Sequence, residues 1–257
     1  MVFFWVIIKW FRRVLITIWF WFWASIATLM LQVAVFVFGA RDHNTITWLI
    51  ENLMANMIYL AMTLPGIWKF TPYHTDGVKG SDYDDVNGPF LLAANHNSIV
   101  DTLFMAIFPS KKSYTFNLKW SWVPIFGPLC VKAGYVGIDS TNSTEKAKVV
   151  PNVIAMMELG YSMMIYPQGA RCTTPLADIN PVDLKHGTFT IAKQSGFKVL
   201  PIAIRGTDTA MRRGGWCDIA TIDVIVCKPF NVTDVEQGKK DYCDAINAAL
   251  KAKIKPD

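Results

Sequence analysis

The chain has 257 residues, which is enough for one catalytic domain with a short appendage and too few for two large domains. Hydrophobic residues make up 52% of it and charged residues 18%, so part of the surface is expected to meet lipid. Its 25 Lys and Arg against 20 Asp and Glu suit an anionic membrane surface or a phosphorylated substrate, and the lack of basic runs interleaved with aromatics argues against nucleic acid.

The first expected element is a long apolar helix. Residues 14–40 contain no charged residue. A helix of that length would run about 40 Å, longer than the roughly 30 Å hydrocarbon core, so it could cross a bilayer with tilt or lie within one leaflet. Lys9, Arg12 and Arg13 precede it, and the positive-inside rule then keeps the N-terminus in the cytoplasm. A cleaved signal peptide is the alternative, but this run is about twice as long as a normal signal sequence core.

A second apolar segment, residues 46–68, carries Glu51 and ends near Pro65 and Gly66. Two such helices in succession form a hairpin, which would return the chain to its starting side and place the rest of it in the cytoplasm. The alternative is that the second segment is a core helix of the catalytic domain. We expect residues 1–70 to anchor the protein in a membrane and residues 71–257 to form the catalytic domain.

A polar, turn-rich stretch at residues 71–88 marks this boundary. Beyond it, short apolar or β-branched runs alternate with helical patterns, which predicts an α/β sheet with covering helices. The expected strands are residues 90–94, 113–116, 135–138, 162–166, 199–204 and 221–227. The expected helices lie near residues 102–108, 122–132, 144–159, 187–194 and 239–253. The five cysteines are widely spaced and match no metal-ligand spacing, so we expect reduced thiols and no metal site.

The strand expected at residues 90–94 runs into a polar turn that opens a helix. His96 and Asp101 are five residues apart, so on one continuous helix they would lie about 140° apart and could not pair. If the helix starts after His96, with Asn97 or Ser98 as its N-cap, Asp101 falls in the first turn and can reach the imidazole. Such a carboxylate would fix the tautomer and stabilise the imidazolium, as in a catalytic dyad. The alternative is that Asp101 only closes a capping box with Ser98.

Two further stretches carry candidate ligand-binding residues. After the strand expected at residues 162–166, Gly169 would let the backbone approach a ligand, and Arg171 offers a planar fork for phosphate oxygens. A solvated loop arginine is the alternative. Lys119 begins an apolar, aromatic stretch that would fit a core segment equally well.

These stretches, in this order, resemble the sequence blocks of the 1-acylglycerol-3-phosphate acyltransferase family of glycerolipid acyltransferases. The first block, N-H-x-S-x-x-D, is matched by Asn95, His96, Ser98 and Asp101. The second is matched by Lys119, Pro124, Gly127, Gly134, Ile138 and Asp139. The third, Phe-Pro-Glu-Gly-Thr-Arg followed by Lys-x-Gly, is matched by Pro167, Gly169, Arg171, Lys185 and Gly187. A last apolar block with proline resembles residues 199–204, and the family's N-terminal membrane helices parallel residues 1–68.

Three residues depart from the family pattern. Gln168 stands where the family usually has Glu, Ala170 where it has Thr, and Ser140 where the second block usually ends in Arg. Gln keeps the size and hydrogen bonding of Glu but loses its charge, whereas Ser in place of Arg removes a candidate phosphate ligand. The expected acceptor is therefore less narrowly defined than the expected reaction.

The resemblance implies a mixed sheet with covering helices, of the glycerolipid acyltransferase type, behind an N-terminal two-helix membrane motif. It implies an enzyme of phospholipid biosynthesis that transfers a fatty acyl group from acyl-CoA or acyl carrier protein to the sn-2 hydroxyl of lysophosphatidic acid, forming phosphatidic acid without cofactor or metal. His96 would act as general base with Asp101 as its partner. The residues expected to bind substrate are Lys119, Gln168, Gly169, Arg171 and Lys185.

The expected partners are the phospholipid bilayer, a lysophospholipid acceptor and an acyl thioester donor, and the catalytic domain is expected to face the cytoplasm from a membrane. Two alternatives stay open: an acyltransferase acting on another lysophospholipid, and a catalytically inactive membrane lipid-binding homologue. A serine hydrolase is disfavoured because residues 160–164, the nearest approach to G-x-S-x-G, lack the second glycine. Cys172 beside Arg171 could be a reactive thiol.

Overall fold

The computed structural model describes residues 2–39, 42–75, 88–106, 111–122, 126–139, 141–172 and 178–252. In this part of the chain, one sheet has the strand order β1-β7-β6-β2-β5-β3-β4. Its strands are β1 Trp68–His74, β2 Leu91–Ala94, β3 Lys112–Asn117, β4 Val136–Ile138, β5 Ser162–Ile165, β6 Val199–Arg205 and β7 Ala220–Val226. The helices that precede β2 are α1 Val2–Val37, α2 His43–Leu49, the π-helical η1 Ile50–Ala55 and α3 Asn56–Thr63. Those that follow are α4 Asp101–Ala106, η3 Leu118–Trp120, α5 Phe126–Lys132, α6 Ser143–Glu158, η4 Pro181–Asp183, α7 His186–Ser195, α8 Thr207–Ala210 and α9 Val235–Lys251.

The sheet is mixed, as expected. Strands β6, β2, β5, β3 and β4 run parallel to one another, whereas β7 is antiparallel to β6 and carries β1 parallel to itself. The carboxyl ends of the five mutually parallel strands therefore meet at one edge of the sheet. The turns after β2, β3 and β5, which contain the candidate site residues, all leave from that edge.

Each of the six expected strands is present to within about two residues at either end, and the expected helices downstream of residue 100 are present with shifted ends. Strand β1 was not expected, because residues 68–74 fell at the end of the apolar segment and the start of the polar stretch. All seven of its residues pair with β7, over 140 residues away in sequence, which no local pattern indicates. Pro72 is tolerated because β1 is an edge strand.

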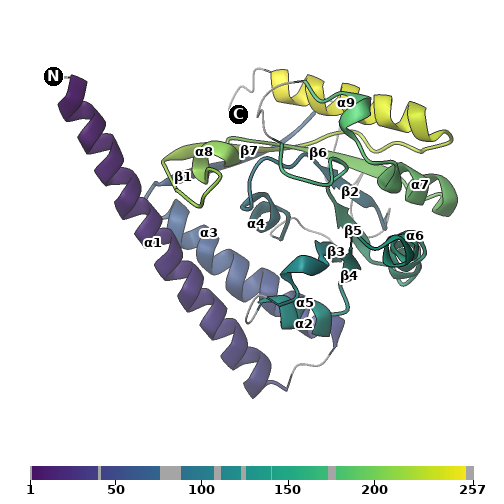
Figure 1. Cartoon of the computed structure of the whole chain (residues 1–257), viewed down its shortest axis with the longest axis horizontal. Helices are drawn as coiled ribbons and strands as arrows, with labels where there is room; N and C mark the ends of the chain where they lie inside the picture. Colours follow the sequence, from purple (N-terminus) through teal and green to yellow (C-terminus); the bar gives the residue numbers. More distant parts are fainter. Residues whose placement is uncertain are drawn as a thin grey trace.

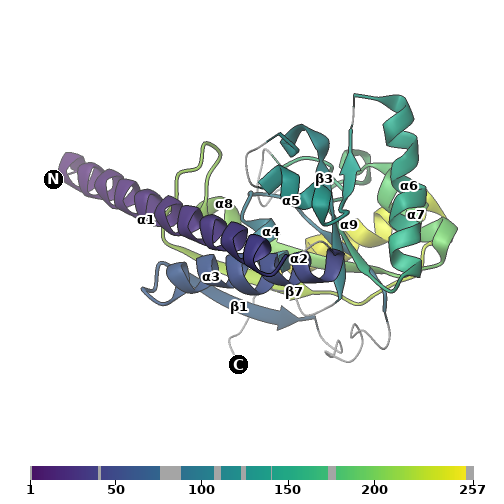
Figure 2. The ribbon, with the colours of Figure 1, turned by 90° about the horizontal axis from the view of Figure 1, so that it is seen from below.

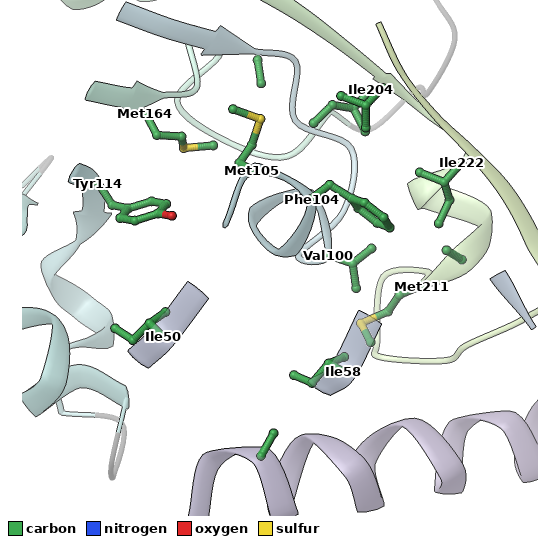
Figure 3. Close-up of a cluster of buried hydrophobic side chains, with 14 of the residues drawn as sticks. Ile50, Ile58, Val100, Phe104, Met105, Tyr114, Met164, Ile204, Met211 and Ile222 are labelled. Carbon is green, nitrogen blue, oxygen red and sulfur yellow. The ribbon is translucent and has the colours of Figure 1, made fainter. Parts of the chain in front are cut away.

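The period of two along each strand divides the interior into two clusters. Leu92 and Ala94 of β2 face the cluster that also contains residues of α1, α2, α3 and α4. Leu91 and Ala93 face the other cluster, which α6, α7 and α9 cover. Figure 1 shows α9 on one side of the sheet, with α4 and the N-terminal helices on the other. In Figure 3, Phe104 of α4 lies deep in the first of these clusters.

The N-terminal segments form the expected helical hairpin, with α3 beside α1 (Figures 1 and 2). One stripe of α1, at helical spacing, is buried against the second arm: Ile16, Phe20, Ala27, Leu31 and Val35. The second arm also packs on α4 and buries Ile46, Leu49, Ile50, Ile58 and Met62 in the same cluster as Phe104. The second arm is therefore a hairpin arm and a core helix at once, which unites the two alternatives.

By length and composition, one helix in the described part of the chain could cross a membrane, over Trp5–Val37. Its outer face is apolar and exposed, with Phe36 at 87% and Val37 at 67% of full exposure. The boundary predicted between residues 70 and 71 falls inside strand β1, and both predicted parts share one buried cluster. The division into two domains stays a prediction.

Candidate active site

Asn95 extends strand β2 beyond its last paired residue. Backbone pairing with β6 ends at Ala94, and the Asn95 side chain then continues it: Nδ2 donates to the Ile204 carbonyl at 2.8 Å, and Oδ1 accepts from the Ile204 N–H at 2.6 Å. An amide can satisfy one acceptor and one donor in this way. The turn that displays His96 is thereby fastened to the central strand β6.

The structure brings His96 and Asp101 together, with Asp101 in the first turn of a helix as predicted, although α4 begins at Asp101 itself and not directly after an N-cap at Asn97 or Ser98. Helix α4 begins at Asp101, and Asp101 Oδ2 lies 2.8 Å from His96 Nδ1. The same oxygen accepts backbone N–H groups from Asn97 at 2.7 Å and Ser98 at 2.8 Å. Asp101 is completely buried, so these bonds define its orientation. Since the carboxylate accepts, Nδ1 carries the ring proton and Nε2 holds a free lone pair.

Half of the alternative capping box is also present. Asp101 accepts the Ser98 N–H, but the Ser98 hydroxyl donates to the Met211 carbonyl at 2.7 Å instead of to helix α4. Asp101 Oδ2 thus accepts both the hydrogen bond from His96 and the capping hydrogen bond from the Ser98 N–H. The His96 side chain keeps 17% exposure, and its Nε2 has no hydrogen-bond partner among the described residues. The free nitrogen is open to a substrate.

Tyr166, at the end of β5, packs face to face on His96, and sequence reasoning assigned it no role. The ring centroids are 3.9 Å apart and the planes differ by 12°. The Tyr166 hydroxyl lies 3.2 Å from Thr102 Oγ1 on α4. Burial, and secondarily the charge of Asp101, raise the pKa of Tyr166 well above its usual value, so the phenol stays neutral. An aromatic residue at a strand end next to Pro167 is the signal that sequence offered.

Gln168 contacts the backbone of His96. Its Oε1 accepts the His96 N–H at 2.8 Å, a role that either an amide or a carboxylate oxygen can fill. The structure therefore gives a physical reason why Gln can stand where the family usually has Glu. Substrate binding by Gln168, which the resemblance implied, stays a prediction.

The loop after Gln168 carries the other third-block residues. Gly169 has a φ of 70°, its N–H donates to the Tyr166 carbonyl at 2.9 Å, and a Cβ there would lie 3.1 Å from Lys185 Cγ. The Lys185 N–H donates to the Pro167 carbonyl at 2.8 Å. Lys185 is thus beside the loop, and the Gly169 N–H is already used within it. The side chains of Lys185 and Arg171 are exposed.

Of the second-block residues, Lys119, Ile138 and Asp139 lie at or just beyond the carboxyl ends of β3 and β4, at the sheet edge of His96, whereas Gly134 precedes β4 and lies at the opposite edge. Lys119 is exposed in η3, directly after β3. A Cβ at Gly127 would lie 2.2 Å from the Ser121 carbonyl oxygen, so only glycine lets α5 approach the turn after η3. The described residues show no contact between Lys119 and the His96 turn. Pro124 and Ser140 lie outside the described residues.

A cavity of about 450 Å³ lies elsewhere, lined by residues including His43, Glu51, Lys112 and Tyr161. Lys112 and Tyr161 stand at the amino ends of β3 and β5, so this cavity opens at the sheet edge opposite His96. His96 is not among the residues that line it.

The five cysteines are free thiols. Burial raises the pKa of Cys130, Cys217 and Cys227 to about 12, so these three stay protonated at neutral pH. The backbone N–H of Cys172 donates to the His96 carbonyl at 2.6 Å. Among the described residues, no group of three or more His, Cys, Asp or Glu side chains is placed to hold a metal ion.

The sequence and the fold of the chain were compared with those of known proteins. A family model described as Acyltransferase matches residues 77–205, about half of the chain. The 1-acyl-sn-glycerol-3-phosphate acyltransferase of Cocos nucifera is 27% identical over 175 residues, 66% of this chain and 55% of that protein. The chloroplastic 1-acyl-sn-glycerol-3-phosphate acyltransferase LPAT1 of Arabidopsis thaliana is 25% identical over 169 residues, 64% of this chain and 45% of that protein.

The chain thus spans about half the length of these curated relatives. The crystal structure of the 1-acyl-sn-glycerophosphate (LPA) acyltransferase PlsC from Thermotoga maritima superposes with a TM-score of 0.76. It covers 96% of this chain and 100% of that chain at 17% identity, which shows a common fold. With the family model matching the segment that carries His96 and Asp101, the chain belongs to the Acyltransferase family.

Proposed function

We propose that the protein transfers a fatty acyl group from acyl-CoA or acyl carrier protein to the sn-2 hydroxyl of lysophosphatidic acid, forming phosphatidic acid. The observation that carries the proposal is the His96 imidazole, held through Nδ1 by the buried Asp101 and open at Nε2. The names of the curated relatives support the choice of acceptor. The donor follows from the acyl transfer reaction, which needs an activated acyl group.

In the proposed mechanism, His96 Nε2 takes the proton of the acceptor hydroxyl as its oxygen attacks the thioester carbonyl. The tetrahedral intermediate then collapses, the carbon–sulfur bond breaks, and the imidazolium returns the proton to the leaving thiolate. Asp101 stabilises the imidazolium and holds the ring in place. General base catalysis of this type contributes about 10² to 10⁴-fold to the rate. Neither metal nor covalent enzyme intermediate takes part.

Three exposed cations serve the acceptor phosphate or the donor. Arg171 follows β5 and Lys119 follows β3, and the side chain of Lys185 lies against Gly169. All three therefore lie toward the carboxyl edge of the sheet. Arg171 suits a phosphate best, because its planar fork can donate two parallel hydrogen bonds. The Gly169 N–H is not available for the developing oxyanion, since it already donates within its own loop.

The N-terminal hairpin would hold this site at a membrane, with the catalytic part in the cytoplasm. One stripe of α1 is buried against the second arm, chiefly η1 and α3, and both of these belong to the core under the sheet. The helix therefore lies along the catalytic part and presents its exposed apolar face to lipid. This packing favours insertion into one leaflet over a crossing, because a crossing helix would separate from the partners that bury Ala27 and Leu31.

The test is a transfer assay with purified full-length protein in mixed micelles. Lysophosphatidic acid, lysophosphatidylcholine and monoacylglycerol would each be offered with acyl-CoA and with acyl carrier protein. We expect the highest kcat/KM with lysophosphatidic acid and its loss in His96→Ala. Equal transfer by His96→Ala would overturn the mechanism, and a higher kcat/KM for lysophosphatidylcholine would overturn the acceptor.

A further inference from the structure

Outside the four sequence blocks, a short turn at residues 211–217 lies between the active site and helix α1. Met211 and Cys217 pair across its base, and the Arg212 N–H donates to the Trp216 carbonyl at 2.9 Å. Gly214 and Gly215 have φ values of 91° and 82°, which let the chain reverse tightly between them. The turn is therefore a small hairpin with a defined shape.

One side of this hairpin is bonded to the catalytic turns. The Ser98 hydroxyl donates to the Met211 carbonyl at 2.7 Å, and Arg213 Nη2 donates to the Arg171 carbonyl at 2.7 Å. The peptide group after Arg171 also donates, through the Cys172 N–H, to the His96 carbonyl at 2.6 Å. Arg213 Nη2 therefore lies no more than about 8 Å from the His96 carbonyl oxygen, since one planar peptide group separates the two bonds.

The other side of the hairpin is bonded to α1. Trp21 Nε1 donates to the Gly215 carbonyl at 3.3 Å, and the Cys217 N–H donates to Thr17 Oγ1 at 2.9 Å. The next residue, Asp218, pairs with Arg12 at 2.7 Å and with Arg13 at 2.6 Å. The hairpin thus joins the helix with the exposed apolar face to the loop that holds His96.

The tip of the hairpin exposes both basic and aromatic side chains. Arg212 and Arg213 are exposed, and Trp216 keeps 47% of its full exposure. Asp218 is the acidic residue of the segment 211–219, and its charge is already matched by Arg12 and Arg13. Arg213 uses Nη2 for backbone carbonyls, while its Nε and Nη1 make no hydrogen bond among the described residues. A net positive tip with an interfacial Trp suits the headgroup level of a bilayer.

We propose that Arg213, supported by Arg212, binds the phosphate of the acceptor lipid as the lipid enters the site from the membrane surface. The inference rests on the proposed function and adds a recognition element outside its sequence blocks. In a glycerol phosphate the reacting hydroxyl and the phosphate sit on neighbouring carbons, so the base and the phosphate-binding cation must lie close together. Arg213 lies close to the turn that carries this base, within about 8 Å of the His96 carbonyl oxygen. Among the described residues, its Nε and Nη1 have no hydrogen-bond partner and can donate to phosphate oxygens.

A purely structural role for Arg213 makes a different prediction. If Arg213 only braced the loop of Arg171, its loss would misplace His96 and lower kcat for every acceptor. If Arg213 binds phosphate, its loss raises the KM for a phosphorylated acceptor and leaves kcat at saturation nearly unchanged. A change in KM alone therefore indicates phosphate binding, whereas a change in kcat indicates a structural role.

The experiment compares Arg213→Gln, Arg212→Gln and Lys228→Gln in micelles of a neutral detergent, which remove the charge of the bilayer. Lys228 is the matched control: it is exposed, loses the same charge, and follows β7, whose carboxyl end lies at the opposite sheet edge. We expect Arg213→Gln to raise the KM for lysophosphatidic acid about ten- to hundredfold, the loss of a charge-assisted bond. Arg212→Gln should raise it about two- to fivefold through its screened charge.

Arg212→Gln also protects the test, because Arg212 makes no side-chain bond among the described residues and its loss should not disturb folding. A KM in both arginine variants equal to that of Lys228→Gln would overturn the inference, as would a lower kcat at unchanged KM in Arg213→Gln. Weaker sedimentation of Arg213→Gln with phosphatidylglycerol vesicles, at a parental KM in micelles, would reassign the arginine to bilayer headgroups. Failure of the unmodified protein to acylate lysophosphatidic acid would overturn the proposed function and this inference together.

Discussion

The side-chain Oε1 of Gln168 accepts a hydrogen bond of 2.8 Å from the backbone N–H of His96. This bond ties the loop after β5 to the turn after β2, so the third and first sequence blocks meet at the candidate base. Tyr166 makes a second contact between the same two segments by stacking on the His96 ring. Three residues thus hold His96: Tyr166 fixes the plane of the ring, Asp101 fixes its tautomer, and Gln168 fixes its backbone.

Gln168→Leu should lower kcat, whereas Gln168→Glu should keep it within about threefold. Leu removes the acceptor and leaves a partly buried N–H without a partner, at a cost of about 1 to 3 kcal/mol, while a carboxylate oxygen can still accept. Steady-state kinetics and thermal melts of both variants check this expectation. Similar losses in the two variants would show that the amide nitrogen of Gln168 matters, which this bond does not require.

His96→Ala should lower kcat by about 10² to 10⁴-fold without a change in fold, because the ring contributes general base catalysis. Circular dichroism alongside the transfer assay separates lost activity from lost structure. Retention of near-parental kcat by a folded His96→Ala protein would remove His96 from the mechanism.

Asp101→Asn should reduce both activity and stability. Three donors converge on Asp101 Oδ2, and its buried Oδ1 has no hydrogen-bond partner in the described structure. Whichever way the amide is placed, its NH₂ group either meets the donors at Oδ2 or lies buried without a partner among the described residues, which costs about 1 to 3 kcal/mol. The measurement is urea unfolding together with kcat. Unchanged stability with lost activity would show that the amide finds an acceptor outside the described residues.

Tyr166→Phe should be mild and Tyr166→Leu severe. Phe keeps the stacked ring and loses only the hydroxyl contact with Thr102, about 0.5 to 1.5 kcal/mol of stability, while Leu also frees the imidazole plane. Because burial raises the pKa of Tyr166 well above 10, its phenol stays neutral from pH 5 to 9 and adds no titration there. The pH profiles of kcat for the parent and Tyr166→Phe should therefore superpose. If one limb of the parent's pH profile of kcat disappeared in Tyr166→Phe, the claim that the phenol does not titrate in this range would be wrong.

Replacing Leu29, Val33 and Phe36 by Gln should weaken membrane binding without unfolding the protein. These side chains are 54% to 87% exposed on the outer face of α1, and burying each in lipid contributes about 1.5 to 3 kcal/mol. Sedimentation with phospholipid vesicles measures the change. Val182→Gln is the matched control, since Val182 is 89% exposed in η4, beside α9. Undiminished vesicle binding by the triple variant would place the lipid contact elsewhere.

Local chemistry determined the elements that sequence predicted well. The short apolar runs of β2 and β5, the apolar length of α1, and the place of Asp101 in the first turn of α4 follow from neighbouring residues. The pairing of His96 with Asp101 belongs to the same class, because five residues and a helix start place the two side chains. Recognition of the four ordered blocks added the family.

Contacts between distant segments were decided by the tertiary structure alone. Strand β1 exists because β7 offers seven partners far along the chain, and the second apolar segment is a core helix because α4 and α1 pack on its two sides. Gln168 reaches the His96 turn, and Arg213 reaches the loop of Arg171, only because the order of β6, β2 and β5 brings these segments to one edge of the sheet. Periodicity along a chain reports which face of an element is buried, but the neighbour that buries it depends on strand order and loop closure, and these are set by the whole fold.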